Sequence, residues 1–182
     1  MSLVCPVRRQ VLLGLSGVAV FSAIPSEAQA SRSAKGVKSL GFHNLHTGER
    51  SQGNYWVNGH YQEGVLSKFS HALRDHRSNE SVPMDKRLYD LLFMLKASLM
   101  TEQDFNVISG YRSPETNAML ASKSHNVAKQ SYHMKGMAMD IAIDDVKLND
   151  VREAAIALKL GGVGYYPRSG FIHVDTGPVR TW

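Results

Sequence analysis

A chain of 182 residues, 43% hydrophobic and 20% charged, predicts one ordinary globular domain without low-complexity regions. The formal net charge of +5 is mild: it fits an ordinary soluble protein and also one that works beside an anionic polymer. No stripe of Lys and Arg alternates with aromatic residues, so we expect no nucleic-acid partner.

The N-terminal segment has the pattern of an export signal. Arg8 and Arg9 precede an apolar run over 11–24, and small residues around Ala30 suit cleavage after that residue. The run is shorter than the roughly 20 residues of a membrane helix, so we expect no stable membrane span. The paired arginines resemble a twin-arginine signal, and a general secretory signal is the alternative.

Two expectations follow from this pattern. Residues 1–30 form a cleaved signal peptide that directs the protein to the periplasm, and residues 31–182 form the mature domain. The only cysteine, Cys5, precedes the apolar run, so the mature chain has no thiolate ligand. Any metal site must therefore use His, Asp and Glu.

Hydrophobic periodicity predicts strands and helices in mixed order along the mature chain. In chain order we expect two strands within 39–57, helices over 64–76 and 82–100, a strand over 105–110, a helix from Pro114, a strand over 138–143, a helix over 151–160 and a hairpin over 161–177. This order predicts an α+β fold, in which helices pack on one side of an antiparallel sheet.

The segment "MAMDIAI" alternates between two faces of a strand. Met139 and Ile141 point to one side as a core face should, whereas Asp140 points to the other. Alanines at 138 and 142 flank Asp140 on its face. The small side chains leave room for a ligand beside the carboxylate.

The segment "FIHVDTG" alternates in the same way. Ile172 and Val174 form an apolar face, and His173 and Asp175 share the polar face. If this strand neighbours the one that carries Asp140, opposed residues would have Cβ atoms about 4.5–5.5 Å apart. Asp140 and His173 would then converge.

A third candidate ligand, His133, lies in the loop before Gly136, a residue that permits a tight turn. Two imidazoles and the Asp140 carboxylate suit Zn²⁺, and three protein ligands leave one position open for water, as in catalytic sites. The spacing alone is not specific, so two surface histidines and an ordinary aspartate are the alternative interpretation.

Longer stretches carry a family resemblance. "SYHMKGMAMDIAI" resembles the SxHxxGxAxD motif of the zinc peptidases that include D-alanyl-D-alanine metallopeptidases, lysostaphin-type relatives and the hedgehog fold. "NLHTGE", "SGYRSPETN", "SHNVAKQSYHMKGMAMD" and "GGVGYYPRSGFIHVDTGPVRTW" resemble one branch, the exported murein endopeptidases. The resemblance implies a hedgehog/D-Ala-D-Ala peptidase-like fold and zinc bound by His133, Asp140 and His173. It also implies peptidoglycan as substrate, with hydrolysis of amides in its stem peptides or cross-links.

The resemblance also implies roles around the metal. Arg112 falls on the family's arginine, which can hold a substrate carboxylate or stabilise an oxyanion, although a structural salt bridge is its alternative role. Ser131, the first residue of the motif, is expected to contact substrate. The general base of several relatives is absent, because Gly170 and Phe171 occupy its two usual positions.

Asp175 is the nearest candidate for this base, and the loop residue His125 is another. Asp175 could instead orient a ligand histidine. Two further functions stay open: a D,D-carboxypeptidase on the same substrate class, and a catalytically silent zinc or cell-wall binding module, which the missing glutamate at position 170 favours. Protein partners, oligomeric state and the bond that is cut cannot be inferred from these motifs.

Overall fold

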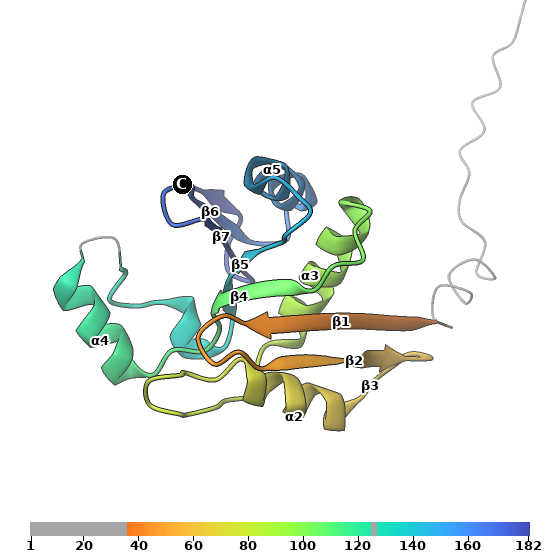
Figure 1. The fold of residues 1–182 in the computed structure, drawn as a ribbon, viewed down its shortest axis with the longest axis horizontal. Coiled ribbons are helices and arrows are strands. Elements are labelled where there is room, and N and C mark those ends of the chain that lie inside the picture. Colours follow the sequence, from red (N-terminus) through yellow and green to blue (C-terminus); the bar gives the residue numbers. More distant parts are fainter. Residues whose placement is uncertain (1–35, 125–126) are drawn as a thin grey trace, which may run out of the picture.

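The computed structural model describes residues 36–124 and 127–182, and within them it shows one sheet with helices beside it (Figure 1). The predicted α+β class is confirmed. The strands are β1 (Val37–Asn44), β2 (Arg50–Val57), β3 (His60–Tyr61), β4 (Phe105–Ser109), β5 (Ala138–Ala142), β6 (Gly162–Tyr166), β7 (Phe171–Asp175) and β8 (Arg180–Thr181). The helices are α2 (Glu63–Ala72), α3 (Lys86–Ser98), α4 (Pro114–Lys123), α5 (Leu148–Leu158) and the short 3₁₀ helix η1 (Tyr132–Lys135).

The sheet has the strand order β3-β2-β1-β4-β5-β7-β6-β8 and is mixed rather than wholly antiparallel. Its central pairs β4–β5, β5–β7 and β6–β7 are antiparallel, as expected. The pairs β1–β4 and β6–β8 are parallel. The chain passes through two helices between β1 and β4, and a long connection of this kind can return a strand in the same direction.

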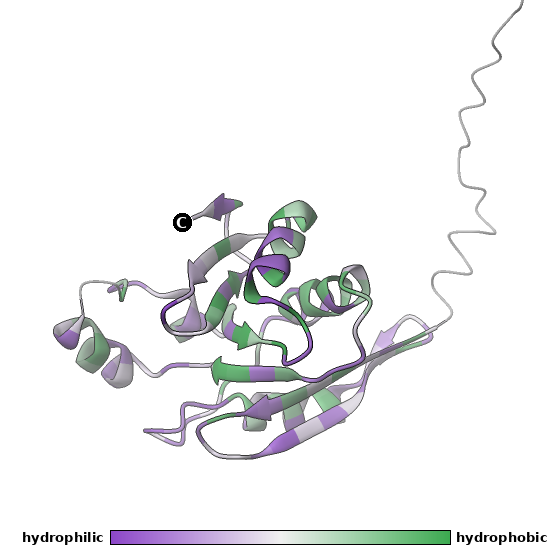
Figure 2. Cartoon of the chain, turned by 45° about the horizontal axis from the view of Figure 1, so that its top comes forward, coloured by the Kyte–Doolittle hydropathy of each residue, from purple (hydrophilic) through white to green (hydrophobic). Residues whose placement is uncertain are grey.

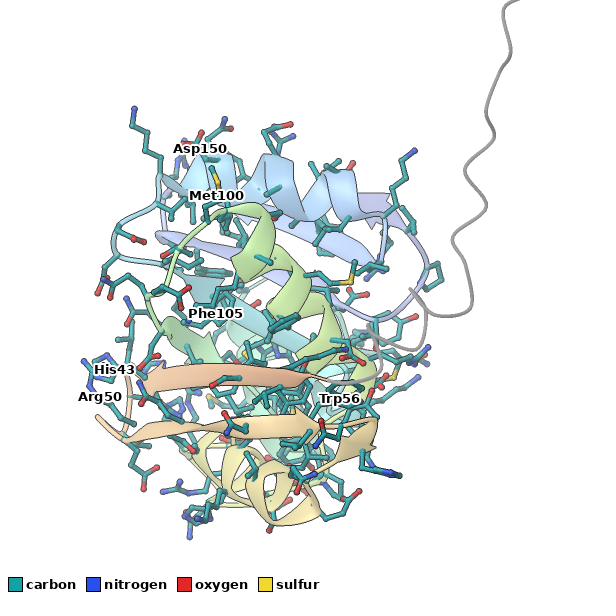
Figure 3. All side chains as sticks on the ribbon, turned by 90° about the vertical axis from the view of Figure 1, so that its right-hand side faces the viewer. His43, Arg50, Trp56, Met100, Phe105 and Asp150 are labelled. Atoms are coloured by element: carbon teal, nitrogen blue, oxygen red, sulfur yellow. The ribbon has the colours of Figure 1, made fainter. Side chains whose placement is uncertain are left out.

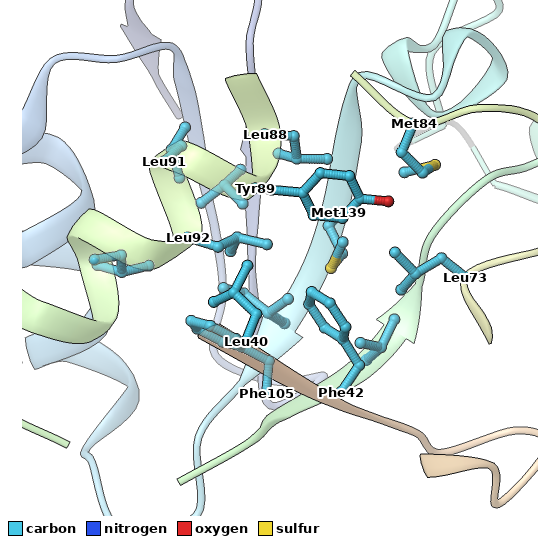
Figure 4. Packing of buried hydrophobic residues seen from close by; sticks show 14 of the residues in the cluster. Leu40, Phe42, Leu73, Met84, Leu88, Tyr89, Leu91, Leu92, Phe105 and Met139 are labelled. Carbon is cyan, nitrogen blue, oxygen red and sulfur yellow. The ribbon is translucent and has the colours of Figure 1, made fainter. Parts of the chain in front are cut away.

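One hydrophobic core lies between the sheet and the helices α2, α3 and α5. Apolar residues gather on the central strands and the adjoining helices (Figure 2), and α3 lies between α5 and α2 (Figure 3). Figure 4 shows the centre of this packing, where Leu92 and Tyr89 of α3 face Phe42, Phe105 and Met139 of the strands. All five side chains are at most 1% exposed. The expected helical layer on one side of the sheet is therefore present.

Helix ends follow local capping signals. The N-terminal helix of the core layer, α2, ends at Ala72, earlier than its apolar periodicity suggested. The next helix, α3, begins at Lys86 because the side chain of Asp85 accepts a hydrogen bond from the backbone of Arg87. Helix α4 begins at Pro114, as predicted, and Ser113 caps it by accepting from Thr116.

One helix, α4, lies outside this layer. Helix α4 stands away from the body of the domain (Figure 1). In the part of the chain that is described, no helix has the length and apolar character needed to cross a membrane. The expected signal peptide over 1–30 lies outside the described residues.

Candidate metal centre and active-site cavity

Asp140 of β5 and His173 of β7 lie directly opposite each other in an antiparallel pair. Oδ1 of Asp140 is 2.9 Å from Nδ1 of His173. Met139 and Ile141, which flank Asp140 along β5, enter the core on the other face of the sheet. The alternation read from the sequence thus places both polar side chains on one face, and the strand pairing brings them together.

His133 reaches the same place from η1, which precedes β5. Ser131 begins this turn by accepting a hydrogen bond from the His133 backbone at 3.3 Å. Gly136 ends it with φ of 64°, and a Cβ there would lie 2.9 Å from the carbonyl oxygen of Pro83. Glycine is therefore required for the chain to turn so tightly into β5. Nδ1 of His133 donates to the carbonyl of Gly110 at 2.7 Å, which turns Nε2 towards the two strands.

Three potential ligand atoms converge as a result. Nε2 of His133 lies 3.2 Å from Nδ1 of His173 and 3.2 Å from Oδ1 of Asp140. Within the described residues, this is the one group of His, Cys, Asp and Glu that could hold a metal ion, with its atoms within 4.8 Å of one another. Nδ1 of His133 and Nε2 of His173 have other hydrogen-bond partners. The lone pairs on Nε2 of His133 and Nδ1 of His173 are therefore directed at the point where the three ligand atoms converge.

Asp175 contacts the far side of His173. Its Oδ2 lies 3.0 Å from Nε2 of His173 and accepts from Arg180 Nη2 at 2.6 Å. Its Oδ1 accepts from Arg180 Nη1 at 3.1 Å and from the backbones of Gly162 and Gly177. Burial opposes its charge, but hydrogen bonds from His173, Arg180 and Gly177 outweigh this and hold the pKa of Asp175 well below its usual range. With 0% exposure and both oxygens engaged, Asp175 does not line the cavity.

The same contacts also shift the pKa of His173. Burial alone would lower the pKa of His173, but its hydrogen bonds to Asp140 and Asp175 outweigh burial and raise the pKa. The pKa of Asp140 is shifted in the opposite direction. Burial opposes its charge, yet the neighbouring His133 and His173 hold the pKa of Asp140 well below its usual range. Asp140 is therefore the negatively charged member of the group at neutral pH.

The C-terminal end of the chain forms one side of this site. The Arg180 guanidinium lies 5.2 Å from the Tyr132 ring centre and 4.8 Å from that of Trp182. The Trp182 ring is 5.3 Å from His173, and its Nε1 donates to the hydroxyl of Tyr166 at 2.8 Å. No pattern in the sequence indicated a role for Arg180 or Trp182. Only the tertiary contacts reveal them, because β8 is two residues long and has no periodicity of its own.

Arg112 lies on the opposite side, just after β4. Its backbone donates to the carbonyl of His133 at 3.2 Å. Its Nη2 is 3.6 Å from Oδ2 of Asp140 and donates to Ser109 Oγ at 3.3 Å, while Nη1 donates to Asn117 Oδ1 at 3.3 Å. Burial lowers the pKa of Arg112 and the Asp140 carboxylate raises it, with burial the larger effect. A guanidinium still charged at neutral pH thus faces the site.

These groups open into a cavity of about 670 Å³. His133, Asp140 and His173 are among its lining residues, and both Arg112 and Arg180 reach it. Ser131, the residue expected to contact substrate, also lines it. Four aromatic residues contribute to its walls: Tyr132, Tyr166, Phe171 and Trp182. The cavity is large enough to receive a segment of peptide beside the three convergent atoms.

The two positions where relatives carry a general base have other roles here. Gly170 has φ of 74° in the turn between β6 and β7, and Phe171 stacks on Tyr166 with ring centres 4.7 Å apart. Neither residue offers a group that can exchange a proton. His125, the other residue considered for this role, lies outside the described residues.

The fold and this site together define a peptidase with a candidate metal centre, and the comparisons identify its family. The family model described as "Peptidoglycan L,D-endopeptidase MepK" matches residues 32–182. The chain is 45% identical over 175 residues to peptidoglycan L,D-endopeptidase MepK of Escherichia coli strain K12, covering 96% of each chain. It is 42% identical over 172 residues to the probable peptidoglycan L,D-endopeptidase MepK of Haemophilus influenzae, covering 93% of this chain and 92% of the relative. The chain therefore belongs to this peptidase family, and the resemblance and enzyme class inferred from its motifs are confirmed.

Proposed function

We propose that this protein is a zinc-dependent endopeptidase that hydrolyses an L,D amide bond in the cross-links of peptidoglycan. The observation that carries the proposal is the convergence of His133, Asp140 and His173 at the wall of a peptide-sized cavity. Membership of a family described as peptidoglycan L,D-endopeptidase supports both the substrate and the reaction.

The spacing of the three atoms supports zinc. Tetrahedral ligands at the usual Zn–N and Zn–O distances of about 2.0–2.1 Å lie roughly 3.3 Å from one another. The three separations among His133, Asp140 and His173 are 2.9, 3.2 and 3.2 Å. Two imidazoles and one carboxylate fill three tetrahedral positions and leave one open to the cavity. Zinc held there would supply a Lewis acid that activates water and polarises an amide carbonyl.

Asp175 has the contacts of a positioning residue in this proposal. It accepts from Nε2 of His173 and thereby leaves Nδ1 as the nitrogen that faces the metal. Its carboxylate is separated from the cavity and neutralised by Arg180. These contacts favour the orienting role over the role of general base.

Arg112 and Ser131 contact the substrate in this proposal. Arg112 presents a partly buried fork of donors beside Asp140, which suits a substrate carboxylate or the oxygen that becomes negative during amide hydrolysis. Ser131 lines the cavity two residues before His133, where its backbone and hydroxyl can align a peptide.

The proposed location is the periplasm. A basic start, an apolar run and a small-residue cleavage point over 1–30 support export and removal of this segment. Peptidoglycan lies outside the cytoplasm, so the proposed substrate requires such an export route. The paired Arg8 and Arg9 favour the twin-arginine route.

The test combines metal analysis with product analysis of purified chain lacking residues 1–30. Cross-linked muropeptides of defined linkage are incubated with the zinc-loaded protein, and the products are identified by mass spectrometry. Conversion of dimers into monomers through an L,D bond supports the proposal. Release of a single terminal residue would instead indicate a carboxypeptidase, and stoichiometric zinc without cleavage would indicate a binding module.

A further inference from the structure

Ser124, which directly follows helix α4, and residues within 127–131 form one wall of the cavity. The helix projects from the domain (Figure 1), and only Thr116 and Asn117 of its residues are buried. The residues of this wall that line the cavity are Ser124, Val127, Ala128, Gln130 and Ser131. A wall with so little apolar burial must be held in place mainly by polar contacts.

Asn117 supplies three such contacts at one point. Its Nδ2 donates to the carbonyl of Ala128 at 3.1 Å and to that of Lys129 at 3.2 Å. Its Oδ1 accepts from Arg112 Nη1 at 3.3 Å. The residue is 2% exposed, and both protons of its amide as well as its carbonyl are engaged. Asn117 thus joins the cavity wall to the arginine beside Asp140.

The contact with Asn117 constrains where the Arg112 guanidinium lies. Nη2 is directed at Ser109 and Asp140, and Nη1 at Asn117, so the plane of the fork is fixed from both ends. An arginine side chain otherwise has extensive rotamer freedom, and its planar fork recognises a carboxylate or oxyanion only in the correct plane. Loss of the Nη1 partner would release one end of this fork.

We propose that Asn117 is a positioning residue, which locks the segment 127–130 against the cavity and orients Arg112 towards the substrate. This inference rests on the proposed function, because it assigns Arg112 to substrate. It adds a means by which the position of the wall and the orientation of the arginine are set together. Substrate that binds between the segment 127–130 and Arg112 is then held by both of them. Displacement of the segment would weaken its own contact with substrate and that of Arg112.

Asparagine suits this position for a specific chemical reason. Aspartate would retain the acceptor for Arg112, but it would set a carboxylate against the carbonyls of Ala128 and Lys129. Alanine would remove all three contacts and leave the Arg112 donor and two carbonyls without this partner. The two variants therefore separate the role of the wall from the role of the arginine.

The first experiment measures hydrogen exchange and is independent of catalysis. We expect Asn117→Ala and Asn117→Asp to accelerate backbone exchange across 127–131, because each removes both donors to this segment. Glu115→Gln is the matched control on the exposed face of the same helix and should leave exchange unchanged. Wild-type exchange rates in both Asn117 variants would overturn the proposal, whatever the substrate of the enzyme.

The second experiment measures cleavage of a defined cross-linked muropeptide by zinc-loaded proteins. Loss of a hydrogen bond to a charged group corresponds to a decrease of about ten- to a hundredfold, and we expect this decrease in kcat/KM for Asn117→Ala with zinc content unchanged. Arg112→Lys should reduce kcat/KM less in the Asn117→Ala background than in the wild type, because the arginine is already displaced. In the Asn117→Asp background, the penalty of Arg112→Lys should persist.

Two outcomes of this second experiment would overturn the inference. Fully additive effects of Asn117→Ala and Arg112→Lys would show that the two residues act independently. Loss of zinc in Asn117→Ala would show that the residue supports the metal site instead. Absence of cleavage by the wild-type protein would refute the proposed function, while the exchange measurement would still decide whether Asn117 holds the wall.

Discussion

Nε2 of His173 lies 3.0 Å from Oδ2 of Asp175, and this contact determines which imidazole nitrogen faces Asp140. A proton on Nε2 satisfies the Asp175 carboxylate and leaves the lone pair on Nδ1 for a metal. Arg180 holds the same carboxylate through two hydrogen bonds, so the ring orientation is set by a chain of three side chains.

Asp175→Asn tests this relationship. The amide oxygen can still accept from His173, but the negative charge that strengthens the contact is lost and Arg180 is left without its anion. We expect zinc affinity to decrease about 10- to 100-fold, as for other groups that orient a ligand. Competition with a fluorescent chelator measures the affinity. Unchanged affinity together with lost hydrolysis would favour the role of general base for Asp175.

The sequence predicted the faces of β5 and β7 because alternation over five residues is a local property. It therefore indicated that Asp140, His173 and Asp175 share one face. It could not decide between the two roles of Asp175, since that depends on Arg180, whose approach is a tertiary contact. The role of Asn117 was equally hidden: its partners on the wall are backbone carbonyls, which have no signature in the sequence.

The sequence also predicted the α+β class but not the parallel pairings of the sheet. The direction in which β4 joins β1 depends on how α2 and α3 pack between them, and no local pattern encodes that choice. The prediction of the metal ligands depended on the motif as well as on periodicity. His133 lies in a turn, where alternation gives no information about direction.

Substitution of any proposed ligand should remove the metal. We expect His133→Ala, Asp140→Ala and His173→Ala to lower zinc content from one ion per chain to well below stoichiometric after dialysis, because two ligands bind zinc weakly. Elemental analysis of the purified proteins measures this. His60→Ala, at an exposed histidine in β3, is the control and should retain one zinc. Full occupancy in the double variant Asp140→Ala/His173→Ala would refute the assignment.

Arg112→Lys should impair catalysis without affecting the metal. Lysine keeps the positive charge but cannot supply the planar fork that reaches Ser109 and Asn117 together. Loss of one charge-assisted contact predicts a decrease of about ten- to a hundredfold in kcat/KM. Steady-state kinetics and zinc analysis on the same preparation measure both properties. A wild-type kcat/KM would assign Arg112 to a structural ion pair with Asp140.

The export prediction concerns residues 1–30, for which the sequence is the only guide. We expect the periplasmic protein to begin at Ser31, which intact-mass spectrometry of a periplasmic extract can establish. The double variant Arg8→Lys/Arg9→Lys should remain in the cytoplasm with its signal attached if the route is twin-arginine. Normal export of this variant would instead indicate the general secretory route.

The stability of the protein in acid should depend on Asp75, which lies behind the segment that carries Arg112. Its Oδ2 accepts from the backbone of Ser113 at 2.9 Å and its Oδ1 from the backbone of Arg77 at 2.9 Å. Burial opposes the charge, but hydrogen bonds from Thr116, Ser113 and Arg77 outweigh it and hold the pKa of Asp75 well below its usual range.

A pKa that is lower in the folded state means that the ionised carboxylate stabilises the fold above its unfolded pKa of about 3.9. This stabilisation is lost as the pH falls through the lower, folded pKa of Asp75. Asp75→Asn should therefore reduce the free energy of unfolding by about 1.5–3 kcal/mol at pH 7, the range for hydrogen bonds to a charged group. The difference in unfolding free energy between wild type and variant should shrink below about pH 4.

Urea unfolding between pH 2 and pH 8 measures the stability of both proteins, with Glu80→Gln as the control at an exposed carboxylate nearby. A constant difference across this range would mean that the ionisation of Asp75 does not contribute to the stability of the fold.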